Sequence, residues 1–247
     1  MSHTLLLYFE EDASRAKQIA HAAAMPLAMV ERHRFPDAEL KLRLPTDLPD
    51  RVTLLRSLDQ PNEKLIELLL VARTARDLGA RHLTLLAPYL AYMRQDMAFQ
   101  AGEVVSQRIV GSFIADLFDA LITVDPHLHR VASLQQAVPV AQAIALSGAP
   151  LLADWIASKH QQPVLIGPDQ ESEQWLSQAA AAHDFEWAVC SKTRYGDRHV
   201  DIHLPSISVV GRPVVLLDDV ASSGHTLAVA ARKLLSAGAS SVDVAVT

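Results

Sequence analysis

Residues 214–226 read VVLLDDVASSGHT, and this stretch decides how the rest of the chain is interpreted. Its four apolar residues, 214–217, predict a strand buried on both faces, because such a strand loses the alternation of polar and apolar residues. Two carboxylates and a turn of small residues follow, and a helical pattern starts after Thr226. Unpaired N–H groups at the start of a helix attract anions. The stretch therefore predicts a phosphate site in an α/β fold, although a plain capped helix after a strand has a similar composition.

The order of residues in this stretch is more specific than their composition. A strand that ends in two acidic residues and leads into a small-residue turn resembles the phosphoribosyl pyrophosphate (PRPP) loop of type I phosphoribosyltransferases. By that resemblance, Asp218 and Asp219 hold ribose hydroxyls. The residues expected to hold the 5-phosphate are Ser222, Ser223, Gly224, His225 and Thr226. His225 stands where that loop usually has glycine.

Composition and charge narrow the class of protein. The chain has 247 residues, half of them hydrophobic, and a formal net charge of −6, which suits one large or two modest globular domains. The acidic balance argues against nucleic-acid and anionic-membrane partners. The single cysteine, Cys190, excludes an internal disulfide and a cysteine-rich metal site, and we expect it to be a small buried residue. With no signal peptide and no membrane-length apolar run, we expect a cytoplasmic protein.

Strands alternate with helices along the chain, which predicts right-handed βαβ units and a mainly parallel sheet. The expected strands are residues 4–9, 52–58, 82–87, 120–124, 163–166 and 214–217, with two short segments, 185–190 and 200–202, around a polar turn. The expected helices are residues 12–24, 62–78 with Asn62 as cap, 105–118, 146–158, 171–182 and 227–239. An antiparallel pair of strands is expected within residues 27–45, around a turn at Pro36-Asp37.

The pattern breaks between residues 138 and 150, where Pro139, Gly148 and Pro150 cluster. This break favours two similar α/β domains in tandem, residues 1–144 and 145–247. The chain stops directly after a strand, so we expect the second domain to be incomplete at its C-terminal end.

Five further motifs carry groups suited to a nucleotide and its phosphates. The first, residues 35–39, reads FPDAE: an aromatic face can stack on a purine while carboxylates accept from its amino group, although a packed phenylalanine in an ordinary turn looks the same. The second, residues 92–96, reads YMRQD, and its arginine offers a fork of donors suited to phosphate. Residues 99–103, FQAGE, follow it, together with Ser106.

The remaining motifs end strands or lie on one. Residues 124–127, VDPH, and residues 167–169, GPD, follow strands at the edge where open α/β sheets place ligands. Residues 191–194, SKTR, place two cations on one side of a strand, an arrangement that suits phosphoryl transfer. Each motif alone also fits a helix cap or a solvated edge. Zinc at His127 and His129 is disfavoured, because no other clustered ligands accompany them.

Taken in order from Phe35 to Thr247, these motifs resemble the ribose-phosphate pyrophosphokinase family. The resemblance implies two tandem phosphoribosyltransferase-like (Rossmann-like) domains with mainly parallel sheets. It implies Mg²⁺-dependent transfer of the β,γ-diphosphoryl group of ATP to the anomeric hydroxyl of ribose 5-phosphate, giving PRPP and AMP. Lys192 and Arg194 are then catalytic, and His127 and Asp169 serve the metal. The residues implied to bind ATP are Phe35, Asp37, Glu39, Arg94, Gln95, Asp96 and His127.

In the family, the residue 35–39 motif reaches the ATP of a neighbouring subunit, so the resemblance implies at least a dimer and is compatible with a hexamer. Three departures from the family pattern leave other functions open. Met97 and Ala98 replace basic residues, Gln170, Glu171 and Ser172 replace small ones, and His225 replaces glycine. One alternative is a non-catalytic paralogue that binds or regulates. The other is a PRPP-consuming phosphoribosyltransferase, which needs the loop at 214–226 but neither Arg94-Gln95 nor the Lys192–Arg194 pair.

Overall fold

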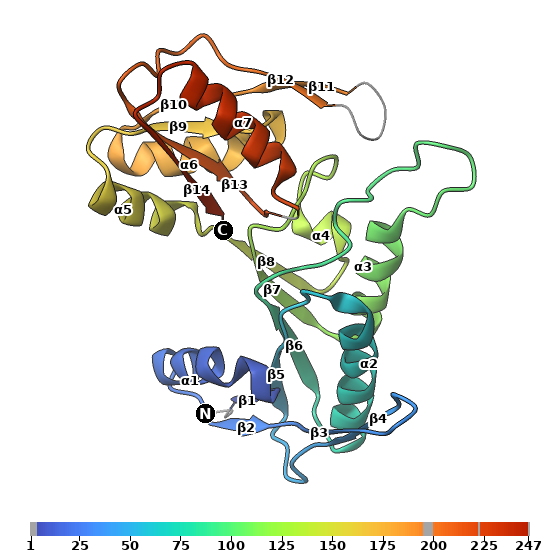
Figure 1. The fold of residues 1–247 in the computed structure, drawn as a ribbon. Helices are drawn as coiled ribbons and strands as arrows, with labels where there is room; N and C mark the ends of the chain where they lie inside the picture. The colour runs from blue at the N-terminus through green and yellow to red at the C-terminus, as the bar shows by residue number, and fades with distance from the viewer. Residues whose placement is uncertain (1–3, 195–199, 222, 247) are drawn as a thin grey trace. The chain divides into compact units, whose positions relative to one another are not determined.

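The computed structural model describes residues 4–194, 200–221 and 223–246 (Figure 1). The chain forms two compact units, residues 1–146 and 147–247. The predicted assignment of separate functions to residues 1–144 and 145–247 stays a prediction. Among the described residues, no helix has both the length and the apolar character that a bilayer crossing requires.

The first unit is built on a six-stranded sheet with the order β2-β1-β5-β6-β7-β8, in which every pair of neighbours is parallel. Its strands are β1 (Thr4–Tyr8), β2 (Leu27–Met29), β5 (Arg51–Leu55), β6 (His82–Ala87), β7 (Ala120–Val124) and β8 (Gln142–Leu146). Its helices are η1 (Glu10–Asp12), α1 (Ala13–Ala22), α2 (Pro61–Asp77), α3 (Ser106–Leu117) and α4 (Leu134–Ala137). The predicted α/β class with mainly parallel sheets is confirmed.

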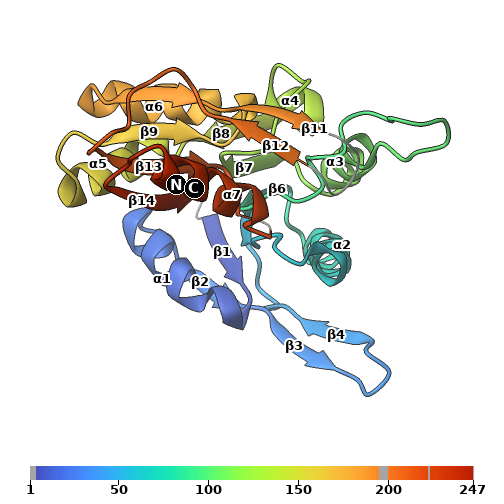
Figure 2. The same cartoon turned by 45° about the horizontal axis from the view of Figure 1, so that its top comes forward.

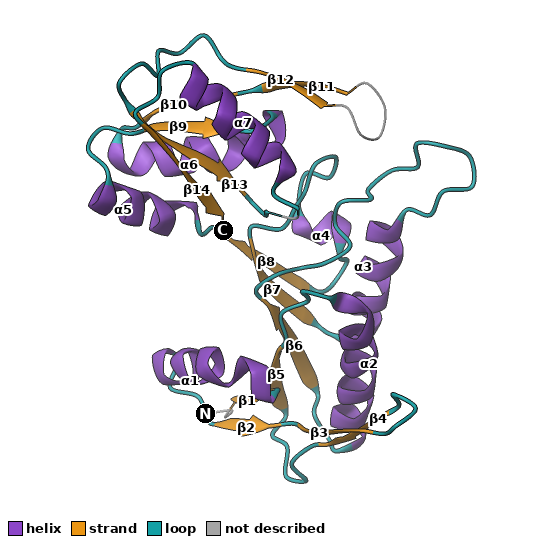
Figure 3. Cartoon of the chain, in the orientation of Figure 1, coloured by secondary structure: helices purple, strands orange, loops and turns teal. Residues whose placement is uncertain are grey.

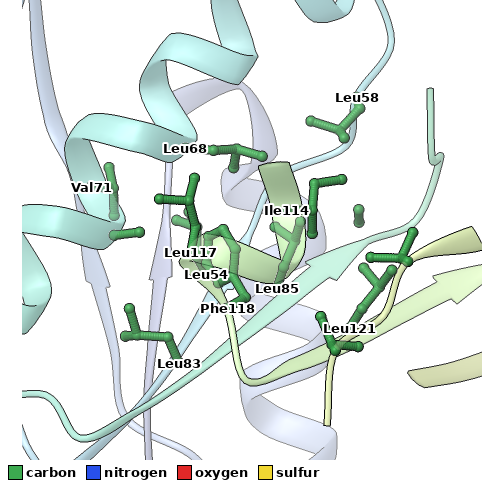
Figure 4. Packing of buried hydrophobic residues seen from close by; sticks show 14 of the residues in the cluster. Leu54, Leu58, Leu68, Val71, Leu83, Leu85, Ile114, Leu117, Phe118 and Leu121 are labelled. Atoms are coloured by element: carbon green, nitrogen blue, oxygen red, sulfur yellow. The ribbon is translucent and has the colours of Figure 1, made fainter. Parts of the chain in front are cut away.

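Helices cover both faces of this sheet, which explains its continuous apolar strands. Leu7 of β1 belongs to one buried cluster with Leu68 of α2 and Ile114 of α3. Figure 4 shows Leu68 and Ile114 within this cluster. Leu6, its neighbour, points to the other face and packs with Ala16 of α1. Successive residues of a strand alternate between faces, so every apolar residue of β1 finds a covered side.

A hairpin of β3 (Glu31–Arg34) and β4 (Leu40–Arg43) extends away from this sheet (Figure 2). The strands are antiparallel and turn at residues 35–39, as the sequence predicted. Side chains of β3 bond to α2: Arg32 Nη1 lies 2.6 Å from Glu67 Oε1, and Arg34 pairs with Glu63. The hairpin is thereby tied to a helix whose other side packs on the sheet.

The second unit has a four-stranded parallel sheet with the order β10-β9-β13-β14 (Figure 3). Leu165 and Val215 pack against α5 (Ala149–Lys159) and α6 (Glu173–His183), whereas Ile166 and Leu216 pack against α7 (His225–Ser236) on the other face. The strands of this unit are β9 (Val164–Gly167), β10 (Glu186–Val189), β11 (Ser191–Arg194), β12 (Val200–His203), β13 (Pro213–Asp218) and β14 (Ser241–Val246). Of these, β11 and β12 form a separate antiparallel pair. The helices of this unit are α5 (Ala149–Lys159), η2 (Gln170–Ser172), α6 (Glu173–His183) and α7 (His225–Ser236).

The two sheets share one local strand order. In the first unit β2 and β5 lie on opposite sides of β1, and in the second unit β10 and β13 lie on opposite sides of β9. The order of strands therefore reverses between β1 and β5 in the first unit, and between β9 and β13 in the second. In open α/β sheets, ligands bind outside the carboxyl ends of the strands at such a point. Different side chains lie at the two switch points: an ion-paired arginine in the first unit and a group of carboxylates in the second.

Buried ion pairs fill the switch point of the first unit. Arg56, directly after β5, is 1% exposed, and its guanidinium lies 2.5 Å from Glu67 of α2 and 2.8 Å from Glu11 of η1. The same guanidinium lies 4.4 Å from the centroid of the Phe9 ring. Burial alone raises the pKa of Glu11, but hydrogen bonds from the backbone, Arg56 and Arg32 lower it to about 2. This edge of the first sheet is thus closed by charge pairing.

Three predictions about local structure are wrong. Helix α2 is capped by Gln60 and begins at Pro61, whose fixed φ suits the first helical position, so Asn62 lies inside the helix and accepts from the Tyr92 hydroxyl instead. The strand predicted at 52–58 ends at Leu55. The helix predicted at 146–158 starts at Ala149, and residues 142–146 form the edge strand β8.

Candidate active site

Three carboxylates gather at the switch point of the second unit. Asp218 ends β13, Asp219 follows it, and Asp169 follows the neighbouring parallel strand β9. The Asp169 loop is held by its own bonds: its Oδ1 accepts from the Glu171 N–H at 3.1 Å, and its carbonyl accepts from the buried Ser172 hydroxyl at 2.6 Å. A Cβ on Gly167 would lie 2.1 Å from Ser172 Oγ, so glycine allows this loop to close.

The electrostatics of the three carboxylates favour a cation. Burial, together with the neighbouring charges of Asp219 and Asp169, raises the pKa of Asp218 to about 7. The hydrogen bond from the Asp219 N–H to Asp218 Oδ1, 3.1 Å, lowers this pKa without cancelling the rise. Within the described ranges, no three acidic, histidine or cysteine side chains form a ready-made metal cage. A magnesium ion here would draw on water and phosphate oxygens, as Mg²⁺ commonly does.

The raised pKa of Asp218 predicts how pH changes stability. A carboxyl with a folded pKa near 7 and an unfolded pKa near 3.8 weakens the fold as pH rises through that window, because the charged form is disfavoured only in the folded state. We expect Asp218→Asn to stabilise the metal-free protein by on the order of 2 kcal/mol at pH 8 and by little at pH 4. Urea unfolding at both pH values measures this, with the exposed Asp184→Asn as control. A gain that is equal at both pH values would contradict the expectation.

The loop after Asp219 leads into a helix N-terminus, as predicted. Gly224 caps α7 with φ +70°, a conformation that favours glycine, and α7 begins at His225, two residues earlier than the predicted helix. The His225 N–H lies 3.4 Å from Ser223 Oγ, and the His225 side chain is exposed. Thr226 lies in the first turn of the helix, and Ser222 lies outside the described residues. The backbone N–H groups of this first turn suit an anion.

Lys192 and Arg194 lie on β11, which pairs antiparallel with β12 in the register Lys192↔Ile202 and Arg194↔Val200. The predicted common orientation of the two cations stays a prediction. Their side chains lie outside the described part of the structure.

Four predicted ATP residues of the first unit follow two neighbouring strands, β6 and β7: Arg94, Gln95, Asp96 and His127. Arg94 is exposed, and Gln95 Nε2 donates to the Met97 carbonyl at 3.0 Å. The Asp96 side chain is only 1% exposed, and its Oδ1 lies 2.7 Å from Arg130 Nη1. His127 lies in the loop after β7, which also carries Arg130.

Sequence reasoning missed Arg130. The available signal was that Arg130 lies in the loop after β7 and Asp96 in the loop after β6: these strands are parallel neighbours, so the loops at their carboxyl ends lie at the same edge of the sheet.

The hairpin motif presents its aromatic ring to solvent. Phe35 is 40% exposed, and the His33 ring meets it edge to face at 4.9 Å. Asp37 Oδ1 accepts from the Glu39 N–H at 3.2 Å, so this carboxylate stabilises the turn. Ala38 has φ +73°, an unusual conformation for a residue with a side chain.

Two family models match the chain: the N-terminal domain of ribose phosphate pyrophosphokinase over residues 4–118, and the phosphoribosyl transferase domain over residues 140–247. The ribose-phosphate pyrophosphokinase of Methanopyrus kandleri is 34% identical over 246 residues, 98% of this chain and 83% of the relative. That of Saccharolobus solfataricus is 32% identical over 240 residues, 93% of this chain and 79% of the relative. The phosphoribosylpyrophosphate synthetase structure from Mycobacterium smegmatis shares the fold, with a TM-score of 0.83, 23% identity and coverage of 99% of this chain and 80% of that one.

The fold and the matches define an α/β enzyme built from two phosphoribosyltransferase-type domains. The chain belongs to the ribose-phosphate pyrophosphokinase family. The family and the fold predicted from the motifs are both confirmed.

Proposed function

We propose that this chain transfers the β,γ-diphosphoryl group of ATP to the anomeric hydroxyl of ribose 5-phosphate, giving PRPP and AMP, with Mg²⁺ as the metal. One observation carries the proposal: Asp169, Asp218 and Asp219 gather at a switch point that leads into the N-terminus of α7. This arrangement offers acceptors for sugar hydroxyls beside donors for a phosphate, which are the two ends of ribose 5-phosphate.

The acceptor substrate would bind in the second unit. Asp218 and Asp219 accept from the ribose hydroxyls, and the 5-phosphate accepts from backbone and hydroxyl groups of the loop. The loop residues assigned to the phosphate are Ser222, Ser223, Gly224, His225 and Thr226. An exposed His225 in the first turn of α7 can add a donor where a glycine would offer only its backbone.

ATP would be held mainly by residues of the first unit. Arg94, Gln95 and His127 contact its phosphates, and Asp96 supports this loop from its buried position. Phe35, Asp37 and Glu39 contact the adenine of ATP on a neighbouring subunit. The proposal therefore requires a homo-oligomer, a dimer at least, and a hexamer is compatible with it. A cytoplasmic location stays a prediction from the sequence.

The chemical step depends on position and charge, as in other phosphoryl transfers. The anomeric oxygen forms a bond to the β-phosphorus while the bond from that phosphorus to the α-phosphate oxygen breaks, and AMP leaves. Lys192 and Arg194 neutralise charge on the transferring group. Asp169 in the second unit and His127 in the first are each proposed as a ligand for Mg²⁺, whose charge would stabilise phosphate oxygens.

Phosphorus NMR of the purified protein with Mg-ATP and ribose 5-phosphate tests the proposal. We expect AMP and PRPP to appear in equal amounts, and neither to form when ribose 5-phosphate is omitted. If the folded, assembled protein produces no AMP, the proposal is wrong and a binding or regulatory role replaces it. If PRPP added with a nucleobase is consumed instead, the chain is a phosphoribosyltransferase.

A further inference from the structure

Arg130 joins the two loops that carry the proposed ATP residues of the first unit. It lies in the loop after β7, and its Nη1 is 2.7 Å from Asp96 Oδ1 in the loop after β6. Its guanidinium also lies 5.9 Å from the centroid of the Phe99 ring. The Arg130 side chain is 44% exposed, so the group is anchored at one end and accessible at the other.

The guanidinium has donors left for a ligand. An arginine offers five N–H groups in a planar fork. Within the described ranges, the only hydrogen bond that Arg130 makes through this fork is the one to Asp96. Its remaining N–H groups are available to oxygen atoms of a second anion. Arginine forks match the oxygens of a phosphate particularly well.

Asp96 anchors Arg130 through one oxygen only. Its Oδ2 is buried and has no hydrogen-bond partner among the residues that the structure describes. Leaving a buried charged oxygen unpaired is costly, and such atoms in folded proteins call for an explanation. A phosphate oxygen cannot pair with this carboxylate, since both are anionic, so the charge of Asp96 depends on Arg130 and the pair holds the guanidinium in place.

The neighbouring sequence lacks the cations expected there. Positions 97 and 98, which follow the Arg-Gln-Asp motif, hold methionine and alanine. Met97 is 36% exposed, and its backbone carbonyl accepts from the Gln95 amide. Because both side chains are uncharged, positions 97 and 98 present no positive charge. Arg130 places a positive charge at the same loop from the adjacent one.

We propose that Arg130 is a further binding residue for the nucleoside triphosphate, and that it supplies to the polyphosphate the positive charge that positions 97 and 98 lack. This inference rests on the proposed function, in which ATP binds at these loops. It adds a residue outside the motifs that identified the site. Asp96 then has the role of fixing the guanidinium in place. Its buried carboxylate holds one edge of the guanidinium, and the other edge stays accessible to the phosphates.

Isothermal titration calorimetry of Mg-ATP binding to the full chain tests this inference. We expect Arg130→Ala to raise the Kd for Mg-ATP by about 10-fold or more, since a charge-assisted hydrogen bond is lost, and Arg130→Lys to raise it less. Adding Met97→Lys to Arg130→Ala should recover most of the lost affinity. The matched control is Arg73→Ala, an exposed arginine on α2 of the same unit, which should leave the Kd unchanged.

The outcomes are distinguishable. If the wild type binds Mg-ATP and Arg130→Ala binds it equally well, the inference is wrong and the proposed function stands. If Arg130→Ala loses affinity together with stability in urea, and Met97→Lys restores neither, Arg130 only neutralises Asp96 and the inference is also wrong. If the wild type binds no Mg-ATP, the proposed function and this inference both fail.

Discussion

Replacing Lys192 by alanine is expected to lower kcat for AMP formation by about 10²–10³-fold, the usual effect of removing one donor that stabilises transition-state charge. The reason is that charge on the transferring diphosphoryl group must be neutralised as the bond to the α-phosphate breaks. KM for ribose 5-phosphate should stay within about 3-fold of the wild-type value, because Lys192 is proposed to bind the transition state and not the bound ribose 5-phosphate. A coupled assay for AMP measures both constants.

The control for this variant is Lys159→Ala, which removes an exposed lysine of α5 in the same unit. It should keep its full activity. The urea unfolding curve of Lys192→Ala should match that of the wild type, so that the loss can be assigned to chemistry. A Lys192→Ala enzyme that keeps more than a tenth of the wild-type kcat would refute a catalytic role for this residue.

Replacing Glu67 by alanine is expected to lower the free energy of unfolding by about 3–5 kcal/mol, the range found when one partner of a buried ion pair is removed. Glu67 is 0% exposed and receives bonds from Arg56 and Arg32. Its loss leaves the guanidinium of Arg56, 1% exposed, without its closest counter-charge. Urea denaturation followed by circular dichroism at pH 7 measures the change.

Glu63, one turn earlier on the same helix, provides the control. Its pair with Arg34 is solvent-exposed, and exposed pairs contribute about 0–1 kcal/mol. Glu63→Ala should therefore be close to wild type. Replacing both buried partners, Arg56→Met with Glu67→Leu, should recover part of the lost stability, because the buried guanidinium is removed with its counter-charge while Glu11 keeps its bond to Arg32. A Glu67→Ala protein no less stable than Glu63→Ala would refute the account.

Strands with unambiguous apolar patterns could be predicted from the sequence. The predicted bounds of β6 and β7 agree with the structure, because both strands are apolar runs closed by polar or turn residues. β8 could not be predicted in the same way. Its five residues, QAIAL, form an edge strand with little burial, and a short run of this kind fits a helix equally well until its neighbours in the sheet are known.

The candidate site also has features that the local sequence predicts and contacts that it does not. The positions of Asp169 and Asp218 after strands, and of residues 223–226 at a helix start, could be predicted because strand ends and helix starts are local features; their roles stay predictions. The inward direction of Asp96 and its pairing with Arg130, 34 residues later, could not. The same holds for Arg56 and Glu11, which pair across 45 residues. Which charges meet across such separations is decided by the order of strands in the sheet, and no local pattern contains that order.

The two sheets share one topology, and the contrast between their switch points has a consequence for stoichiometry. In the first unit, Arg56, Glu67 and Glu11 occupy the place where a parallel sheet ordinarily receives a ligand. In the second, the same place holds the carboxylates of Asp169 and Asp218. Under the proposed function, the acceptor site therefore lies in the second unit alone, and each further acceptor site in an assembly would have to come with a further subunit.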